Sequence, residues 1–406
     1  MKPLSSPSPC LRDSVWLLLA FCGALVACQA PEHTLTIAVA LLPSELPGYR
    51  EVIAGFERES GWRVVIVPQQ YADIRRALAA EAAAGSGTLD LVELDLYSLA
   101  AAATDVALLD EDALAPELSA LAPAAVHAGR IRGLRFLPHR LTWQALLYDQ
   151  RVLGRAPQTW DELLAAARAH PGRIGMKGAL YEGLTCDVLP FVWAAGGDAA
   201  DFDGPGAHAA FRLFAALAPA LNPQSPTFRE ASIAEAMARG EIILHLNWPF
   251  AMSLFSSQGL APNPIRSAPL PRGPAGTATV LGGGYLAIPR GAPQADTALR
   301  LAGYLLSADA QRQLHQRLGW FSARGDVPVD DGGTLLAGFA ALRDDVRTRP
   351  ESADYPFLSR LWQEAFRAVA FAHADPDAAL AAAARRWAAR QEQRPRERSA
   401  PAGATR

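Results

Sequence analysis

The chain has 406 residues, of which 50% are hydrophobic and 19% are charged, and its formal net charge is -3. This length exceeds what one compact core usually supports, and the composition is that of a folded globular protein, so we expect two lobes. Positive and negative residues are mixed along most of the chain, which argues against binding to nucleic acid or to an anionic membrane through charge alone. The partner that this composition favours is a small or neutral molecule.

The N-terminus has the features of a secretory signal peptide. Lys2 and Arg12 precede the apolar run VWLLLAFCGALVA, about 13 residues ending at Ala27, which is too short to span a bilayer as a permanent helix. We therefore predict that residues 1–27 are a signal peptide. The letters LVAC at its end resemble a bacterial lipoprotein signal, which implies that Cys28 is lipidated and becomes the first residue of the mature chain. A signal peptide with an incidental cysteine is the alternative.

The cysteines predict a mature chain without an internal disulfide. Of four cysteines, Cys10 and Cys22 would leave with the signal peptide and Cys28 would carry the lipid, so Cys186 remains alone. No histidine lies near Cys186 at a spacing typical of catalysis or metal binding, and we expect this residue to pack as a small buried hydrophobe.

The segment after the signal alternates between strand and helix patterns. Residues 34–42, rich in β-branched and apolar side chains, predict a strand, and residues 47–61 predict a helix that ends at a glycine. Residues 62–69 predict a second strand, residues 71–87 a second helix and residues 89–95 a third strand. This β-α-β-α-β order predicts a largely parallel sheet covered by helices on both faces.

Two acidic residues follow strands of that predicted sheet. Glu45 comes just after the first strand and Asp95 ends the third. In open sheets of this kind, ligands bind beyond the carboxyl ends of the strands. Both carboxylates are therefore candidates for a ligand-binding site.

The middle of the chain predicts a passage into a second lobe. LRFLPHRLTWQALLYD is a long apolar stretch interrupted by Pro138, His139 and Arg140, as expected where one strand leaves a lobe and another enters the next. In the helix predicted after it, Thr159 and Glu162 have the spacing of a capping box.

Mainly helical patterns follow, and two further strands come after them. IILHLNW predicts a strand, and GGGYLAIPRG predicts a strand entered through three glycines. Those glycines could make a flexible crossing, let a ligand approach the backbone, or form a plain turn. A helix pair, an aromatic loop and two amphipathic, alanine-rich helices complete the expected fold, and residues 396–406 are expected to be disordered.

Six segments, taken in order, carry a resemblance to a known family. They are LDLVELDLYSLA, LLYDQRVLGRAPQTWDELLAAA, YEGLTCDVLPFVWAAGGD, AEAMARGEIILHLNWPFAMSL, GGGYLAIPRGAPQADTALRLAGYLLSADAQRQL and GWFSARGDV. With these segments the chain resembles the extracellular solute-binding proteins of carbohydrate-type ABC importers, which include maltose- and trehalose-binding proteins. The resemblance implies a two-lobed α/β fold, the periplasmic binding protein-like fold of type II. Each lobe would have a largely parallel sheet flanked by helices, and the ligand would lie between the lobes.

The same resemblance implies how the chain divides. Lobe I is expected over residues 31–140 and 287–323, and lobe II over residues 141–286 and 324–395. The chain would cross between them near residues 138–141, 284–288 and 322–326. The lobes would close around the ligand.

A sugar presents hydroxyl groups at its rim and C–H faces above and below, so its sites combine planar polar groups with stacked aromatic rings. The ligand-binding residues implied by the family motifs are Glu45, Asp95, Tyr148, Glu182, Trp248, Gly283, Tyr285 and Arg324. Arg140 and Trp143, in PHRLTW, depart from the usual family pattern and could also face the cleft. If Arg140 does so, its guanidinium would suit a carboxylate or a phosphate as well as hydroxyl groups.

Each of these residues also has a purely structural interpretation. Glu45 could be a solvated loop acid, Asp95 a helix N-cap, Trp248 core packing, and Arg324 or Arg140 part of an ion pair.

The resemblance implies a lipid-anchored monomer in the periplasm or at the cell surface that captures a sugar or oligosaccharide and delivers it to ABC permease subunits. The alternatives are a receptor for a sugar phosphate, acidic sugar, polyol or polyamine, a sensor that has lost transport, or a glycosidase. We see no nucleophile motif, metal-ligand spacing or phosphate loop, so we expect no catalysis, metal or cofactor, and no nucleic-acid partner.

Overall fold

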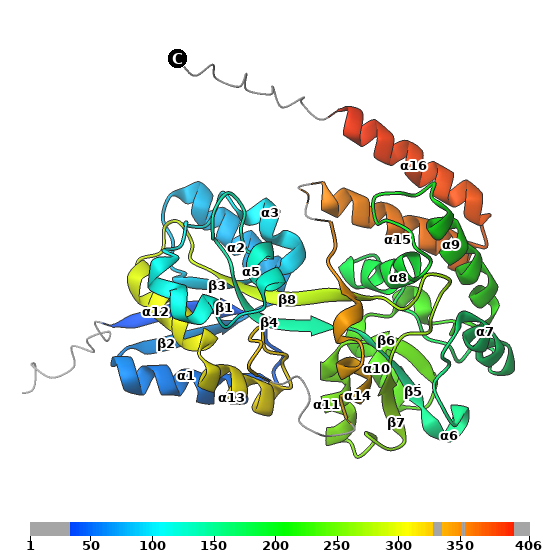
Figure 1. The fold of residues 1–406 in the computed structure, drawn as a ribbon, viewed down its shortest axis with the longest axis horizontal. Helices are drawn as coiled ribbons and strands as arrows, with labels where there is room; N and C mark the ends of the chain where they lie inside the picture. Colours follow the sequence, from blue (N-terminus) through cyan, green and yellow to red (C-terminus); the bar gives the residue numbers. More distant parts are fainter. Residues whose placement is uncertain (1–32, 328–334, 351, 353, 394–406) are drawn as a thin grey trace, which may run out of the picture.

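The computed structural model describes residues 33–327, 335–350, 352 and 354–393. The predicted signal peptide, the lipidation site at Cys28 and the expected disorder of residues 396–406 lie outside the described residues. Figure 1 shows two halves, one built on the N-terminal strands and the other on the middle and the C-terminal helices.

The N-terminal half contains the predicted β-α-β-α-β unit. Its strands are β1 (Thr34–Val39), β2 (Arg63–Pro68) and β3 (Leu91–Asp95), and β1 pairs in parallel with both β2 and β3. The connecting helices are α1 (Leu46–Ser60) and α2 (Tyr71–Ala84). Helix α1 buries the apolar side chains that recur at helical spacing and ends at Gly61, whose φ of 74° suits a left-handed C-cap. The prediction for this region is confirmed.

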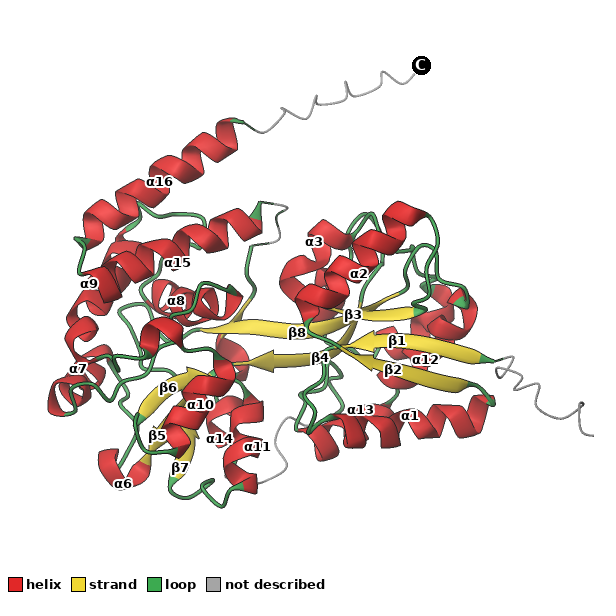
Figure 2. Ribbon diagram, turned by 180° about the vertical axis from the view of Figure 1, so that it is seen from behind, coloured by secondary structure: helices red, strands yellow, loops and turns green. Residues whose placement is uncertain are grey.

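Two strands run from one half into the other. They are β4 (Leu137–Trp143) and β8 (Thr279–Ala287), which pair antiparallel with each other. In the large sheet the order is β2-β1-β3-β8-β4, with β8 antiparallel to β3, while β9 (Val346–Arg347) pairs in parallel with the other end of β8. Figure 2 shows β4 and β8 extending side by side between the halves. These strands give the protein a continuous hydrogen-bonded connection between its halves.

The second half departs from the predicted largely parallel sheet. Its three strands, β5 (Ala145–Asp149), β6 (Leu244–Asn247) and β7 (Ile265–Ala268), have the order β6-β5-β7, and both pairings are antiparallel. The expectation of a parallel sheet is therefore wrong for these strands. The reason is the path of the chain: β5 follows β4 after one residue and runs away from the first half, whereas β6 and β7 run in the opposite direction.

Helices cover both sheets. Half of the predicted capping box is confirmed, because Thr159 is an N-cap, whereas the Glu162 carboxylate accepts from the Gln158 N–H at 2.8 Å and not from the Thr159 N–H. Helix α7 (Trp160–Ala169) begins after Thr159, whose hydroxyl accepts a bond from the Glu162 N–H. The other helices of eight or more residues are α8 (Glu182–Ala194), α9 (Pro205–Leu217), α10 (Glu230–Ala238), α11 (Pro249–Ser257), α12 (Ala295–Leu306), α13 (Ala308–Leu318), α15 (Tyr355–Ala372) and α16 (Pro376–Glu392). The shorter ones are α3 (Leu99–Ala102), α4 (Ala115–Leu118), α5 (Pro123–Ala128), α6 (Gln150–Leu153) and α14 (Ala337–Ala340).

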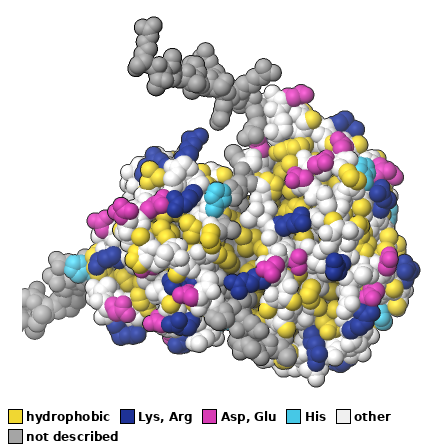
Figure 3. All heavy atoms as spheres, in the orientation of Figure 1, with side chains coloured by type: hydrophobic (Ala, Val, Ile, Leu, Met, Phe, Trp, Pro, Cys, Tyr) yellow, Lys and Arg dark blue, Asp and Glu magenta, His cyan; other side chains and the backbone are white. Residues whose placement is uncertain are grey.

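The predicted state of Cys186 is confirmed, because its thiol is free and buried within α8. On the face drawn in Figure 3, acidic and basic side chains are interspersed over both halves rather than gathered by sign. This distribution agrees with the absence of a basic patch in the sequence. Among the described helices, none is both long and apolar enough to cross a membrane.

Candidate functional site

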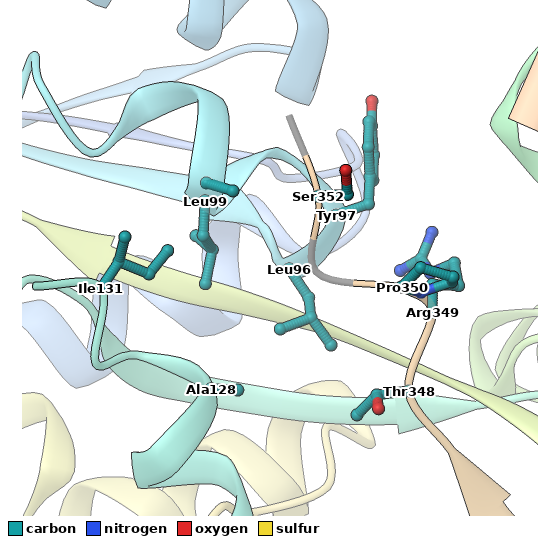
Figure 4. A pocket seen from close by; sticks show the side chains of 10 residues that line it. Leu96, Tyr97, Leu99, Ala128, Ile131, Thr348, Arg349, Pro350 and Ser352 are labelled. Carbon is teal, nitrogen blue, oxygen red and sulfur yellow. The ribbon is translucent and has the colours of Figure 1, made fainter. Parts of the chain in front are cut away.

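A cavity lies between the two halves. It measures about 240 Å³ and is lined on one side by residues of α2 and of the segment after β3, including Tyr71, Arg75 and Tyr97. Ser352 and Pro356, from the segment that leads into α15 and from its first turn, line the other side. A smaller hollow of about 20 Å³ adjoins it and shares Tyr97 and Ser352. Figure 4 shows how Arg349 and Pro350 of that segment lie close to Tyr97 in the smaller hollow.

Arg349 bridges the two halves at this place. One of its nitrogens, Nη2, donates to Asp95 Oδ1 at 3.2 Å, and the other, Nη1, donates to Glu182 Oε1 at 2.8 Å. Asp95 is the last residue of β3 in the first half, and Glu182 is the first residue of α8 in the second. The Arg349 side chain is only 3% exposed, so this is a largely desolvated arrangement of two carboxylates and one guanidinium.

Hydroxyl groups and aromatic rings complete the surroundings of this ion pair. The hydroxyls of Tyr355 and Ser359, one turn apart on α15, both donate to the Glu182 carboxylate. The Tyr97 and Tyr355 ring centroids are 6.2 Å apart, and the Arg349 guanidinium lies over the Tyr97 ring. Hydrogen-bond acceptors, hydrogen-bond donors and aromatic rings therefore lie close together between the halves.

Burial dominates the electrostatics of this cluster. It raises the pKa of Asp95 above its ordinary value of 3.8 even though the Arg349 guanidinium acts in the opposite direction. Burial also raises the pKa of the Tyr97 hydroxyl, and the Asp95 and Glu182 carboxylates add to that shift. The tyrosine hydroxyls are therefore neutral hydrogen-bonding groups at physiological pH.

A second buried cluster lies in the first half, next to the crossing strands. Glu93, in the middle of β3, has no exposed side-chain surface and accepts from Arg140 Nη2 at 3.0 Å and from the Ala40 N–H at 3.1 Å. His139 Nδ1 lies 2.9 Å from the other carboxylate oxygen. Burial alone would raise the pKa of Glu93, but Arg140 and His139 outweigh it and hold the pKa below 4.5.

Trp320 joins Arg140 to Glu45. Its ring lies 3.7 Å from the Arg140 guanidinium, and its Nε1–H donates to Glu45 Oε1 at 2.8 Å. The other oxygen of Glu45 accepts from the Leu42 N–H at 2.8 Å. The Glu45 carboxylate is thereby fixed at the start of α1, with 14% of the side chain exposed.

The three glycines before Tyr285 have a steric role in the structure. A Cβ at Gly284 would overlap the Glu93 carboxylate, and a Cβ at Gly282 would press on the Trp248 ring at about 3.0 Å. At Gly283 a Cβ would lie 2.7 Å from the Arg140 carbonyl oxygen. Because all three lie within β8 and no positive φ occurs there, it is close packing across the crossing strands that requires glycine.

The structure brings some of the sequence-predicted residues together. Asp95 and Glu182 share Arg349 between the halves, and Glu45 and Arg140 share Trp320 in the first half. Asp95 also accepts from the Tyr97 N–H, so it is an N-cap as well.

Other predicted residues are not among those that line the two hollows. The Tyr285 hydroxyl donates to the Ala125 carbonyl from a fully buried position, and Trp143 Nε1–H donates to the Phe339 carbonyl. Tyr148 is buried in β5. Arg324 pairs with Asp326 at 2.8 Å and donates to the Leu306 carbonyl.

Sequence reasoning missed residues that the site depends on. They are Glu93, Tyr97, Arg349, Tyr355 and Ser359. Tyr355 and Ser359 stand four residues apart at the start of an amphipathic helix, which is a signal that places them on one face. Nothing in the letters RTRPESADY indicates that Arg349 reaches a carboxylate more than 250 residues earlier in the chain.

Comparisons with known proteins define the class. A family model described as bacterial extracellular solute-binding protein matches residues 51–334, and the chain belongs to this family. A curated relative from Deinococcus radiodurans, named "Probable ABC transporter-binding protein", is 26% identical over 329 residues, which cover 73% of this chain and 77% of the relative. The chain is thus a solute-binding component of an ABC transporter and not an enzyme, as predicted.

Solved structures support the fold. The maltose-bound MalE3 of T. maritima is similar with a TM-score of 0.78 and 26% identity, covering 87% of this chain and 99% of that one. A solute-binding protein from Thermotoga lettingae bound with alpha-D-tagatose has a TM-score of 0.77 and 24% identity, covering 87% and 98%. The predicted relationship to maltose-binding proteins and the predicted α/β periplasmic binding protein fold are confirmed.

Proposed function

We propose that this protein captures a sugar or oligosaccharide between its two halves and delivers it to a membrane permease. The observation that carries this proposal is the cluster of Asp95, Arg349 and Glu182 between the halves, with tyrosine rings beside it. Sugar hydroxyls both donate and accept, and sugar C–H faces pack on aromatic rings, so this mixture of groups matches a carbohydrate. The similarity to a maltose-bound protein supports the same choice.

The residues proposed to hold the ligand follow from that cluster. Asp95 and Glu182 accept from hydroxyls, Arg349 donates, and Tyr97 offers a ring face. Glu45 and Trp248 stay candidates for an outer part of a longer ligand. Closure of residues 31–140 and 287–323 onto residues 141–286 and 324–395 would bury the ligand and present the closed shape to the permease.

The experiment is a thermal-shift screen of the purified chain without its signal peptide. The panel is maltose, trehalose, glucose, tagatose and ribitol, because a ligand at 100 times its Kd stabilises the folded state by about 2.7 kcal/mol. We expect at least one compound to raise the unfolding temperature, and Asp95→Asn to lose that increase. Asp296→Asn, an exposed acid in the first turn of α12, is the matched control and keeps it. No shift with any compound, or an equal shift in Asp95→Asn, would contradict the proposal.

We also propose that Cys28 carries a lipid that anchors the chain to a membrane beside the permease. The LVAC motif and the membership in an extracellular family support this anchor. Metabolic labelling with palmitate tests it. We expect the label in the wild type and its loss in Cys28→Ala, and equal labelling of both would remove the anchor.

A further inference from the structure

Acidic groups outnumber basic groups in the two buried clusters near the cavity, the second of which reaches it through the contact of Arg140 with Tyr71. Four carboxylates, those of Glu45, Glu93, Asp95 and Glu182, surround the guanidiniums of Arg140 and Arg349. Arg75, which lines the cavity, is paired with Asp105 at 2.9 Å and adds no net charge. The formal balance of these side chains is therefore an excess of two negative charges behind the walls of the cavity.

The Arg140 guanidinium is largely enclosed by partners within the first half. Its Nη2 donates to Glu93, to the Ala40 carbonyl and to the Tyr71 hydroxyl, and the Trp320 ring covers one face at 3.7 Å. Only 13% of its side chain is exposed. Its Nη1 lies 3.9 Å from Glu45 Oε1, so a phosphate or carboxylate that approached Arg140 would meet the Glu45 carboxylate, while Glu93, whose side chain has no exposed surface, already holds Nη2.

The buried site of Glu93 is formed by groups from several parts of the first half. A buried carboxylate is costly unless it is paired and hydrogen-bonded, and Glu93 is held by a backbone N–H, a histidine nitrogen and a guanidinium. The absence of a side chain at Gly284 on the neighbouring strand makes room for it. The effect of this arrangement is to commit Arg140 to the interior of the first half.

Arg349 is committed in the same way. Its Nη1 and Nη2 donate to Asp95, Glu182, the Cys186 sulfur and the Leu281 carbonyl. Its Nε is buried without a hydrogen-bond partner among the described residues, and its side chain is 3% exposed. A neutral hydroxyl can join such a cluster by donating to a carboxylate, because it brings no charge. An anion would meet two carboxylates that already hold the cation.

From these contacts we infer that the cleft selects uncharged polar solutes and rejects their anionic derivatives, and that Glu93 is a specificity-determining residue because it neutralises Arg140 without touching the solute. This inference rests on the proposed function. Glu93 acts through Arg140, so its removal changes the charge of the site rather than a contact with the solute.

The test compares matched pairs of probes by isothermal titration calorimetry. The neutral members are maltose, trehalose, glucose, tagatose and ribitol, and each is paired with its phosphate monoester. For the wild type we expect the phosphate ester of any sugar that binds to bind at least about tenfold more weakly than its parent, because a phosphate group with a charge of about -1.5 to -2 at pH 7 meets an acidic site of low effective dielectric. An ester that binds as tightly as its parent would overturn the inference and leave the proposed function standing. Absence of binding by every neutral compound would overturn the proposed function itself.

The variant Glu93→Gln tests whether Glu93 is the group that neutralises Arg140. We expect the ratio between the ester and parent dissociation constants to fall by about tenfold, since Arg140 then carries an uncompensated charge. Glu57→Gln, which removes the partner of Arg50 in α1, is the matched control and keeps the wild-type ratio. A wild-type ratio in Glu93→Gln would overturn the role of Glu93.

If Glu93→Gln does not fold, Glu182→Gln is measured on the same pairs. Glu182 shares Arg349 with Asp95 and is 18% exposed. Its replacement is expected to lower the same ratio, and an unchanged ratio there would contradict charge neutralisation as the basis of selectivity.

Discussion

Replacing Arg349 with glutamine removes the guanidinium that lies between Asp95 of the first half and Glu182 of the second. The variant keeps a polar side chain of similar reach but leaves two acids facing each other between the halves. Removal of one partner from a buried ion pair typically lowers the free energy of unfolding by about 3 to 5 kcal/mol. The acids are 20% and 18% exposed, so water reaches them in part, and we take the lower end, about 3 kcal/mol.

The assay is thermal unfolding followed by circular dichroism. A loss of about 3 kcal/mol corresponds to a fall in Tm of about 6 °C at roughly 2 °C per kcal/mol for a chain of this size. The sign of the pH dependence follows from Asp95. Its folded pKa is already raised by burial, and loss of Arg349 raises it further, so the protonated form stabilises the fold at low pH and that stabilisation is lost as the pH rises. The deficit of Arg349→Gln is therefore smaller at about pH 4 than at about pH 7.

Arg50→Gln is the control for this prediction. Arg50 also pairs with a glutamate, at 2.6 Å, but its side chain is 42% exposed, and such pairs contribute roughly 0 to 1 kcal/mol. If Arg349→Gln unfolds at the wild-type temperature, or if its Tm falls no further than that of Arg50→Gln, the ion pair between the halves does not stabilise the fold.

Three further outcomes follow from buried contacts. Gly284→Ala should lower the free energy of unfolding by about 1–3 kcal/mol, because the new methyl group overlaps the Glu93 carboxylate. Gly291→Ala, whose methyl group would make ordinary van der Waals contacts at 3.6 to 3.8 Å, should stay close to wild type in the same urea titration. Lys177→Met should lower the free energy of unfolding by about 3–5 kcal/mol, because it leaves Asp187 buried without the ammonium group that lies 2.7 Å away. Adding Asp187→Leu should restore much of this loss, and no recovery in the double variant would contradict the pairing. The folded pKa of Glu93 is lowered, so its ionised carboxylate stabilises the fold above its ordinary pKa of 4.5, and this stabilisation is lost as the pH falls through the folded pKa. The stability gap between wild type and Glu93→Gln should therefore narrow as the pH falls below 4.5, and a gap independent of pH would refute the ionised state.

Much of the first half could be predicted because its elements are local. The alternation of apolar runs with helical spacing marks β1, α1, β2, α2 and β3, and the parallel pairing follows from the short connections between them. The antiparallel sheet of the second half could not be derived in this way. Long helical insertions separate β5, β6 and β7, and no sequence pattern in a short buried strand records the direction of its neighbour.

The candidate site was predictable only in part, for a similar reason. Asp95 and Glu182 stand where local reasoning places functional groups, at a strand end and a helix start. Arg349 and Glu93 did not stand out, because their importance lies in partners far away in the chain. The family motifs imply that Tyr285 binds a ligand, yet its hydroxyl donates to the Ala125 carbonyl from within the core, because the strand pairing decides which way the side chain of a strand residue faces.

The amino-acid sequence by itself determined the class of this protein. Its length, its alternating strand and helix patterns and its six family segments were sufficient for a two-lobed α/β solute-binding protein. Only the tertiary structure decided the charge of the cleft. Whether Arg140 and Arg349 are free to bind an anion depends on which carboxylates lie within 3 to 4 Å of them, and those are supplied by strands and helices distant in the chain. A guanidinium has the same charge in any sequence, but its partners in the folded chain determine what it can still bind.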